Sequence, residues 1–156
     1  MIPTEQFIRR LEALKPGDLG LLRKHAGLPL DESLSSFDLF TGLWWPLRQR
    51  SQQAPRREVA WLIAKLYGLY PIPHANDATL ATQLGGIQPL DERRQQRFDH
   101  LLSLPLAQLE PALQWALGVI ADHTNRLDWV RLTDQVSRWE REETRLKWAR
   151  EYLRLP

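Results

Sequence analysis

The stretch LDWVRLTDQVSRWEREETRLKWAREY, residues Leu127–Tyr152, decides the fold class. Asp128 stands where the N-cap of a helix is expected, directly before an apolar stripe. The members of that stripe recur at helical spacing: Trp129, Leu132, Val136 and Trp139. Because this period is typical of a helix with one buried face, we predict a helix after Asp128. A second helix is expected from about residue 140 to residue 153.

The aromatic side chains of this stretch have two interpretations. Apolar stripes at helical spacing normally pack in a core, so Trp129 and Trp139 are predicted to be buried. The last helix is expected to bury a similar stripe: Trp139, Leu146, Ala149 and Leu153. Trp148 and Tyr152 lie at the edge of that stripe, beside Arg141 and Arg145. Both packing under arginine stems and stacking on a nucleic-acid strand fit that position.

Residues that begin and end helices recur through the rest of the chain. Thr4 and Asp18 are expected to cap the first two helices, and Pro46 is expected to end the third. Further helices are expected at 57–69, 90–104, 106–122 and in the last stretch, and residues 70–86 are expected to form a loop with room for one short helix. No alternating pattern is longer than four residues, so no strand is predicted. We predict an all-α protein of two small packed helical bundles with about eight helices, divided into lobes 1–86 and 87–156.

Composition narrows the class of function. The 156 residues contain no cysteine, and the net charge of +2 hides a strong preference for arginine, with 17 arginines against 4 lysines. Without cysteine, thiolate catalysis and cysteine-based zinc sites are excluded. The four histidines show no i, i+4 pair, and no glycine-rich phosphate loop is present. We therefore predict a protein that is not an enzyme and holds no metal or cofactor.

The first residues and the longest apolar run indicate where in the cell the protein is expected. The first residues, MIPTEQFIRRLEAL, lack the apolar core of a secretory signal. The longest apolar run, about Trp115–Ala121, is far shorter than the roughly 20 residues that span a bilayer. We expect a soluble cytoplasmic protein without a membrane partner.

A second group of arginine and aromatic residues lies on the helix predicted at 57–69. Arg57, Trp61 and Lys65 are four residues apart on its polar side, so Trp61 is expected to be partly exposed. Two functions fit these patterns. The chain is either a subunit that contacts nucleic acid or a structural adaptor that docks proteins through arginine and tryptophan.

The motifs and their order resemble the CasB family, the small subunit of the type I-E CRISPR surveillance complex called Cascade. The resemblance rests first on Leu127-Asp128-Trp129 with Leu132 and Trp139, and on the closing pattern from Arg145 to Tyr152. Four earlier segments agree in the same order: LLRKHAG (21–27), FDLFTGLW (37–44), APRREVAWLIAKLYGL (54–69) and RRQQRFDHLL (93–102). The resemblance covers nearly the whole chain.

The resemblance implies a non-catalytic role inside a complex with guide RNA, target DNA, other Cascade subunits and a second copy of the chain. Such a subunit steadies the displaced strand of the R-loop through contacts to phosphates. Carried over by matching position, the leading candidates for phosphate contact are Arg23, Lys24, Arg56, Arg57, Arg141 and Arg145. The candidates of second rank are Arg93, Arg97, Arg131 and Arg138. For Arg93 and Arg131, an exposed ion pair is the favoured interpretation.

Overall fold

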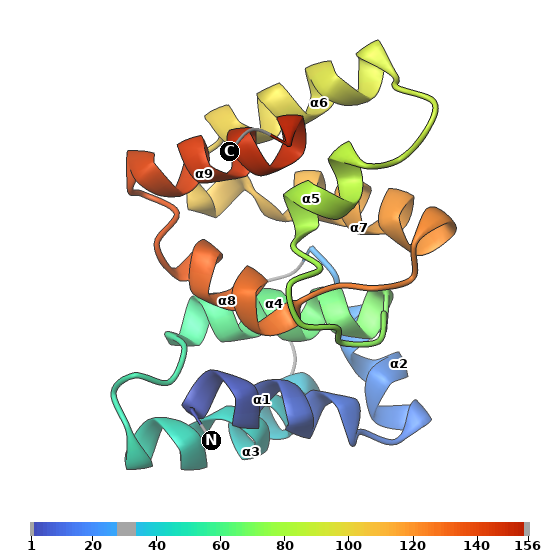
Figure 1. The fold of residues 1–156 in the computed structure, drawn as a ribbon. Coiled ribbons are helices and arrows are strands. Elements are labelled where there is room, and N and C mark those ends of the chain that lie inside the picture. The colour runs from blue at the N-terminus through green and yellow to red at the C-terminus, as the bar shows by residue number, and fades with distance from the viewer. Residues whose placement is uncertain (1, 28–33, 155–156) are drawn as a thin grey trace. The chain divides into compact units, whose positions relative to one another are not determined.

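Every regular element of the computed structural model is helical within the residues it describes, 2–27 and 34–154 (Figure 1). Nine α-helices and one 3-10 turn lie in those ranges, so the predicted all-α class is confirmed. No helix in the same ranges is long and apolar enough to cross a membrane. The chain divides into two compact units, residues 1–71 and 72–156.

The first unit is built around an aromatic cluster. Its helices in the described ranges are α1 (Pro3–Glu12), α2 (Pro16–Lys24), α3 (Leu34–Arg50) and α4 (Arg57–Leu69). Phe40 of α3 stacks on Trp44 at 5.7 Å and meets Trp61 of α4 edge to face at 5.4 Å. Trp61 is therefore only 5% exposed, and the prediction that it is partly exposed is wrong. The aromatic contacts to α3 draw it into the core.

Prolines set the starts of the first two helices. Pro3 and Pro16 occupy the first helical positions of α1 and α2. A proline is favoured there because its missing N–H would have no helical partner and its fixed φ suits the first turn. The predicted caps, Thr4 and Asp18, consequently lie inside the helices, so that part of the prediction is wrong.

The third helix continues past the proline that was expected to end it. Pro46 lies inside α3, which runs on to Arg50. A proline at this position removes one backbone hydrogen bond, which costs about 3 kcal/mol in a helix interior. Leu47 is 1% exposed and extends the buried stripe of Phe40 and Leu43. Burial of this leucine offsets part of the cost, which a local reading of the sequence does not take into account.

The second unit is held together by a cluster of four buried aromatic side chains, Phe98, Trp139, Trp148 and Tyr152. Its helices are α5 (Leu80–Gly85), α6 (Glu92–Ser103), α7 (Glu110–His123), α8 (Trp129–Ser137) and α9 (Glu142–Leu153), with the 3-10 turn Leu106–Gln108 before α7. Phe98 of α6 stacks on Trp148 and Tyr152 of α9, at 6.4 Å and 4.3 Å between ring centres. Trp139 meets Trp148 edge to face at 4.9 Å.

This cluster decides the question about the aromatics of the last helix. Trp129, Trp139 and Trp148 have no exposed surface, and Tyr152 is 9% exposed. Packing is therefore the role of all four, as predicted for the first two and left open for the others. The predicted stripe on α9 is wrong in part, since Leu146 and Leu153 are more than half exposed. The buried face of α9 is turned toward Phe98 instead.

The second unit begins before the predicted division because residues 72–79 bind to the start of α8. The backbone of Ala75 donates to Leu127 at 3.0 Å, and that of Asp128 donates to Ala78 at 2.7 Å. The indole N–H of Trp129 donates to the carbonyl of Ile72 at 2.7 Å. The predicted division after residue 86 lies inside this unit. These hydrogen bonds join segments that are about fifty residues apart, so a local sequence pattern cannot predict them.

Asp128 joins both parts of this connection, and its replacement is our first testable prediction. One carboxylate oxygen accepts from the backbone N–H of Arg131 as the N-cap of α8, and the other accepts from that of Asp77, each at 2.8 Å. We expect Asp128→Ala to lower the free energy of unfolding by about 2 kcal/mol, because a helix cap and a buried acceptor are lost together.

The measurement is thermal or urea unfolding followed by circular dichroism. Asp128→Asn keeps one acceptor oxygen and should lose less stability than Asp128→Ala. Asp99→Ala, on the exposed side of α6, is the matched control and should be close to the parent protein. Equal stabilities of Asp128→Ala and Asp99→Ala would contradict the structural role of Asp128.

Candidate nucleic-acid interface

Arg23 and Lys24 lie at the end of α2, against the end of α4. The guanidinium Nε of Arg23 donates to the carbonyl oxygen of Gly68 at 3.2 Å, which fixes its stem. The rest of its side chain and that of Lys24 face solvent. Near this point burial raises the pKa of the Tyr67 hydroxyl, and the Glu12 carboxylate raises it further. The Tyr67 phenol therefore carries no charge at neutral pH.

Arg56 and Arg57 lie at the opposite end of α4. They form the N-cap and first residue of this helix, and both are exposed. Arg56 makes an ion pair with Glu58 at 3.5 Å, with both side chains well solvated. About 17 Å of helix separates Arg57 from Gly68, at 1.5 Å per residue. The structure therefore does not bring the two predicted pairs of the first unit together.

Three of the predicted arginines meet at the turn between α8 and α9. Arg138 ends α8, Arg141 precedes α9, and Arg145 lies in the first turns of α9. The carbonyl oxygen of Arg138 accepts from the backbone N–H of Arg141 and from the hydroxyl of Thr144, each at 3.0 Å. The Nε of Arg145 donates to the carbonyl of Trp139 at 3.1 Å, with its guanidinium over the ring. We call Arg138, Arg141 and Arg145 the corner arginines.

The corner arginines do not create a strong positive field. Glu140, Glu142 and Glu143 lie in the same turn and are exposed. Within residues 2–27 and 34–154, however, neither Arg138 nor Arg141 has a carboxylate within ion-pair distance. Any attraction for phosphate at this turn therefore comes from individual guanidinium groups, which bind phosphate oxygens in pairs, and not from net charge.

Arg93 and Arg97 line a groove between α6, the 3-10 turn and α7. Both are exposed and lie one turn apart on α6. The groove has a volume of about 690 Å³ and is lined by Arg93, Gln96, Arg97, His100, Leu104, Gln108, Pro111, Ala112 and Trp115. The guanidinium carbon of Arg97 lies 4.5 Å from the centre of the Trp115 ring. We call this the α6–α7 groove, and no aspartate or glutamate is among the described residues that line it.

The α6–α7 groove and the corner arginines are linked by a hydrogen bond between Trp139 and Leu104. Leu104 lines the groove, and its carbonyl oxygen accepts from the indole N–H of Trp139 at 2.8 Å. Trp139 in turn holds Arg145 through its own carbonyl. Leu104 and Trp139 thus link the groove arginines to the corner arginines. This group holds five of the predicted arginines of the second unit: Arg93, Arg97, Arg138, Arg141 and Arg145.

Arg131 stands apart from this group. Its guanidinium lies 3.6 Å from a carboxylate oxygen of Asp77, and the Asp77 side chain is 88% exposed. This is the exposed ion pair that the sequence analysis favoured for Arg131. Such pairs are worth little, so the pairing alone assigns it no role in binding.

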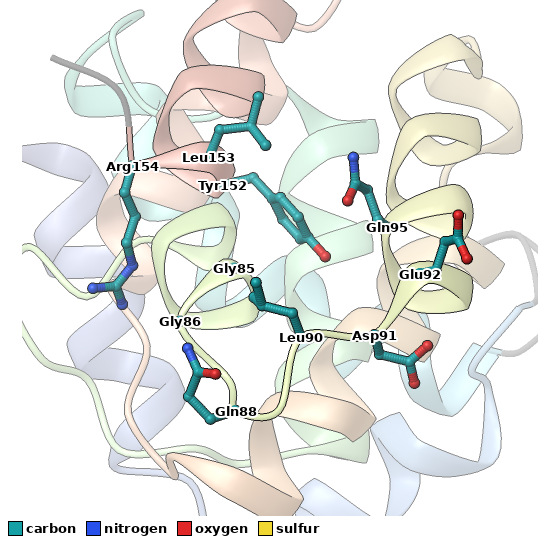
Figure 2. Close-up of a pocket in the computed structure, with 10 residues that line it drawn as sticks. All are labelled: Gly85, Gly86, Gln88, Leu90, Asp91, Glu92, Gln95, Tyr152, Leu153 and Arg154. Atoms are coloured by element: carbon teal, nitrogen blue, oxygen red, sulfur yellow. The ribbon is translucent and has the colours of Figure 1, made fainter.

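A second hollow in the same unit has the opposite electrostatic character. It has a volume of about 530 Å³ and lies among Gly85, Tyr152, Leu153 and the start of α6. Figure 2 shows the carboxylates of Asp91 and Glu92 on one side of it and Arg154 on the other. Two exposed carboxylates repel phosphate, so this hollow is not suited to a nucleic-acid backbone.

Sequence reasoning missed Trp115 and Gln108 as parts of the interface. Trp115 belongs to the longest apolar run of the chain, a position typical of an ordinary core residue. In the structure it is half-buried, with Arg97 over its ring. Arg97 and Trp115 belong to different helices, so only the packing of α6 on α7 reveals the pair.

The family model described as CRISPR-associated protein Cse2 matches residues 18–153. The chain belongs to the Cse2 family. The resemblance to CasB proteins seen in the sequence is thereby confirmed. No curated protein matches significantly.

Solved structures agree with this assignment. The crystal structure of CasB from Thermus thermophilus matches with a TM-score of 0.77 and 26% identity, covering 98% of this chain and 99% of that one. A second crystal structure from the same species, of a CRISPR-associated protein of the Cse2 family, gives the same values. CasB from M. ruber matches with a TM-score of 0.78 at 24% identity, covering 99% and 94%, and supports the fold alone.

Proposed function

We propose that this Cse2-family chain is the non-catalytic small subunit of a type I-E RNA-guided surveillance complex, Cascade, in antiviral defence. In this proposal its partners are the other Cascade subunits, a second copy of itself, guide RNA and target DNA. Its arginines contact phosphates of the guide–target region and of the displaced strand, and thereby stabilise the R-loop. The proposal places the protein in the cytoplasm, where guide and target meet.

The observation that carries this proposal is the connected group of exposed arginines on the second unit. Arg93, Arg97, Arg138 and Arg141 are exposed, and none has a carboxylate within ion-pair distance among the residues that the structure describes. Arginine is the residue best suited to phosphate because its planar fork offers paired donors. Contacts to phosphate carry no sequence information, which suits a subunit that serves any guide.

A few such contacts are sufficient for the proposed role. Formation of an R-loop exchanges a DNA duplex for a hybrid of nearly equal stability, as in RNA-guided recognition of another type. A change of about 1.4 kcal/mol therefore shifts target binding tenfold. Two or three arginine–phosphate contacts supply a free energy of that order.

The test is charge reversal in the reconstituted complex with guide RNA. We expect Arg56→Glu with Arg141→Glu to weaken target binding about tenfold or more, with a smaller dependence of affinity on salt, because contacts that release counterions are lost. The measurement is R-loop formation across a salt series. Arg131→Glu, a single reversal at an arginine that stands apart from the connected group, is the comparison variant and should have a smaller effect.

The adaptor function makes a different prediction in the same experiment. If the chain docks proteins only, the charge reversals should either leave target binding unchanged or prevent the subunit from joining the complex. Normal assembly with full target binding at every salt concentration would therefore overturn the proposed phosphate contacts. The aromatic anchor that the sequence suggested for an adaptor, Trp61, is buried and is not available for docking in this structure.

A further inference from the structure

We propose that the α6–α7 groove binds one unpaired nucleotide, whose base lies against Trp115 and Arg97 and whose phosphate lies at Arg93. This inference rests on the proposed function and deepens it, because it assigns a base-binding site to a subunit otherwise expected to touch only the backbone. The ligand class is single-stranded nucleic acid without sequence preference. The displaced strand of an R-loop is one source of such nucleotides.

The charge of the groove selects an anion. Within the part of the chain that the structure describes, nine residues line it, and they include Arg93, Arg97 and His100 but no aspartate or glutamate. The second unit as a whole carries twelve acidic and eleven basic residues, so a lining free of acid departs from its surroundings. Within the described residues, Arg93 and Arg97 also lack a carboxylate within ion-pair distance. Their donors are therefore free to bind a phosphate.

The aromatic wall selects a flat group attached to that anion. The guanidinium of Arg97 covers part of the half-buried Trp115 ring, and the two present a flat surface of aromatic and delocalised groups. Bases stack well on both tryptophan rings and guanidinium planes. Leu104, Pro111 and Ala112 add apolar surface. A bare phosphate or a carboxylate would make no use of these groups, whereas a nucleotide uses both.

The size of the groove fits a single nucleotide. Its volume of about 690 Å³ lies within the range of roughly 300–1,000 Å³ in which small-molecule sites fall. A base within a duplex has both faces covered by its neighbours, so only an unstacked base can lie on Trp115. The amides of Gln96 and Gln108 can adapt to any base edge, because each amide offers both a donor and an acceptor.

The test separates the contribution of bases from that of phosphates. The full-length chain is titrated at low salt with a single-stranded DNA oligonucleotide and with an abasic oligonucleotide of equal length. We expect the parent protein to bind the normal strand about tenfold more tightly, as stacking of one base implies. Trp115→Leu should remove this preference and leave binding of the abasic strand unchanged. Trp45→Leu, at an exposed tryptophan of the first unit, is the matched control and should keep the preference.

The outcomes distinguish this inference from the proposed function. Equal binding of both strands by the parent protein, or an intact preference in Trp115→Leu, overturns the nucleotide site. The R-loop experiment with Arg56 and Arg141 still decides the phosphate contacts independently. Loss of binding to both strands in the double charge reversal, with the preference unaffected by Trp115→Leu, would support the phosphate contacts alone.

Two further measurements protect the test against misfolding and against another ligand. Photocrosslinking of the parent protein to a strand with 5-bromouracil should label peptides of α6 or α7, whatever the stability of the variants. Labelling confined to the first unit would overturn the site. Competition by an acidic peptide as effective as competition by single-stranded DNA would likewise overturn it, because the groove would then select negative charge alone.

Discussion

Gly85→Ala should lower the free energy of unfolding of the second unit by about 3 kcal/mol, near the top of the usual range for overpacking. Helix α5, which ends at Gly85, packs closely on α9 (Figure 1). A Cβ atom at Gly85 would lie 2.8 Å from the Cα of Tyr152 and closer still to its carbonyl oxygen. These are backbone atoms, which cannot rotate away as a side chain can. The helix propensity gained by alanine, at most about 1 kcal/mol, does not offset this clash.

The neighbouring glycine provides a matched control. At Gly86 an added Cβ would meet mainly the guanidinium of Arg154, which is the far end of a flexible and exposed side chain. We expect Gly86→Ala to cost less than about 1 kcal/mol, because the arginine can move aside at little cost. Urea unfolding followed by circular dichroism measures both variants. Equal effects of the two substitutions would show that α5 and α9 do not approach each other at Gly85.

At a third glycine, replacement by alanine is expected to raise the stability instead of lowering it. Gly20 lies inside α2, and none of the described atoms lies within 4 Å of the place that a Cβ atom would take. Gly20→Ala should therefore stabilise the first unit by roughly 0.5–1 kcal/mol through helix propensity alone. The three variants together separate the space around a glycine from its conformational freedom.

Local signals in the sequence are sufficient for much of the fold. The bounds of α4 are predicted correctly, and Asp128 caps α8 as expected, because both depend on residues close together in the chain. Pro46 is wrongly expected to end α3 because burial of Leu47 offsets part of the cost of a proline inside the helix. Trp61 misleads because the helical wheel of α4 does not show that α3 covers this tryptophan. In each case the decisive contact joins residues that are distant in sequence or on another element.

The sequence predicts which arginines belong to the candidate interface, but it does not predict which of them lie close together. Each arginine can be named from the motifs, but the helical wheel gives no reason to associate Arg97 with the α8–α9 turn. The link between them is Leu104, which lines the groove and whose carbonyl oxygen accepts a hydrogen bond from the indole N–H of Trp139. The separation of Arg23 and Lys24 from Arg56 and Arg57 likewise follows from the direction of α4. Only the packing of helices places surface charges relative to one another.

Trp139→Ala should be the most destabilising single change in the second unit, with a loss of about 4 kcal/mol. Trp139 has no exposed surface and meets Trp148 edge to face. Its removal leaves a cavity beside Trp148 and deprives the carbonyl of Leu104 of its donor. Because this indole also joins the α6–α7 groove to the corner arginines, the loss should extend to binding of nucleic acid.

Two matched variants divide this effect into its parts. Trp139→Phe retains most of the ring and should lose about 2 kcal/mol, from the smaller volume and the unpaired Leu104 carbonyl. Trp45→Ala removes an indole that is 46% exposed and should lose less than about 1 kcal/mol. Unfolding of each variant by urea gives the order of stability directly. If Trp139→Ala were no worse than Trp45→Ala, the joint between Leu104 and Trp139 could not position the arginines. The case for a connected interface on the second unit would then be weakened, because the hydrogen bond from Trp139 to Leu104 links the groove to the corner arginines.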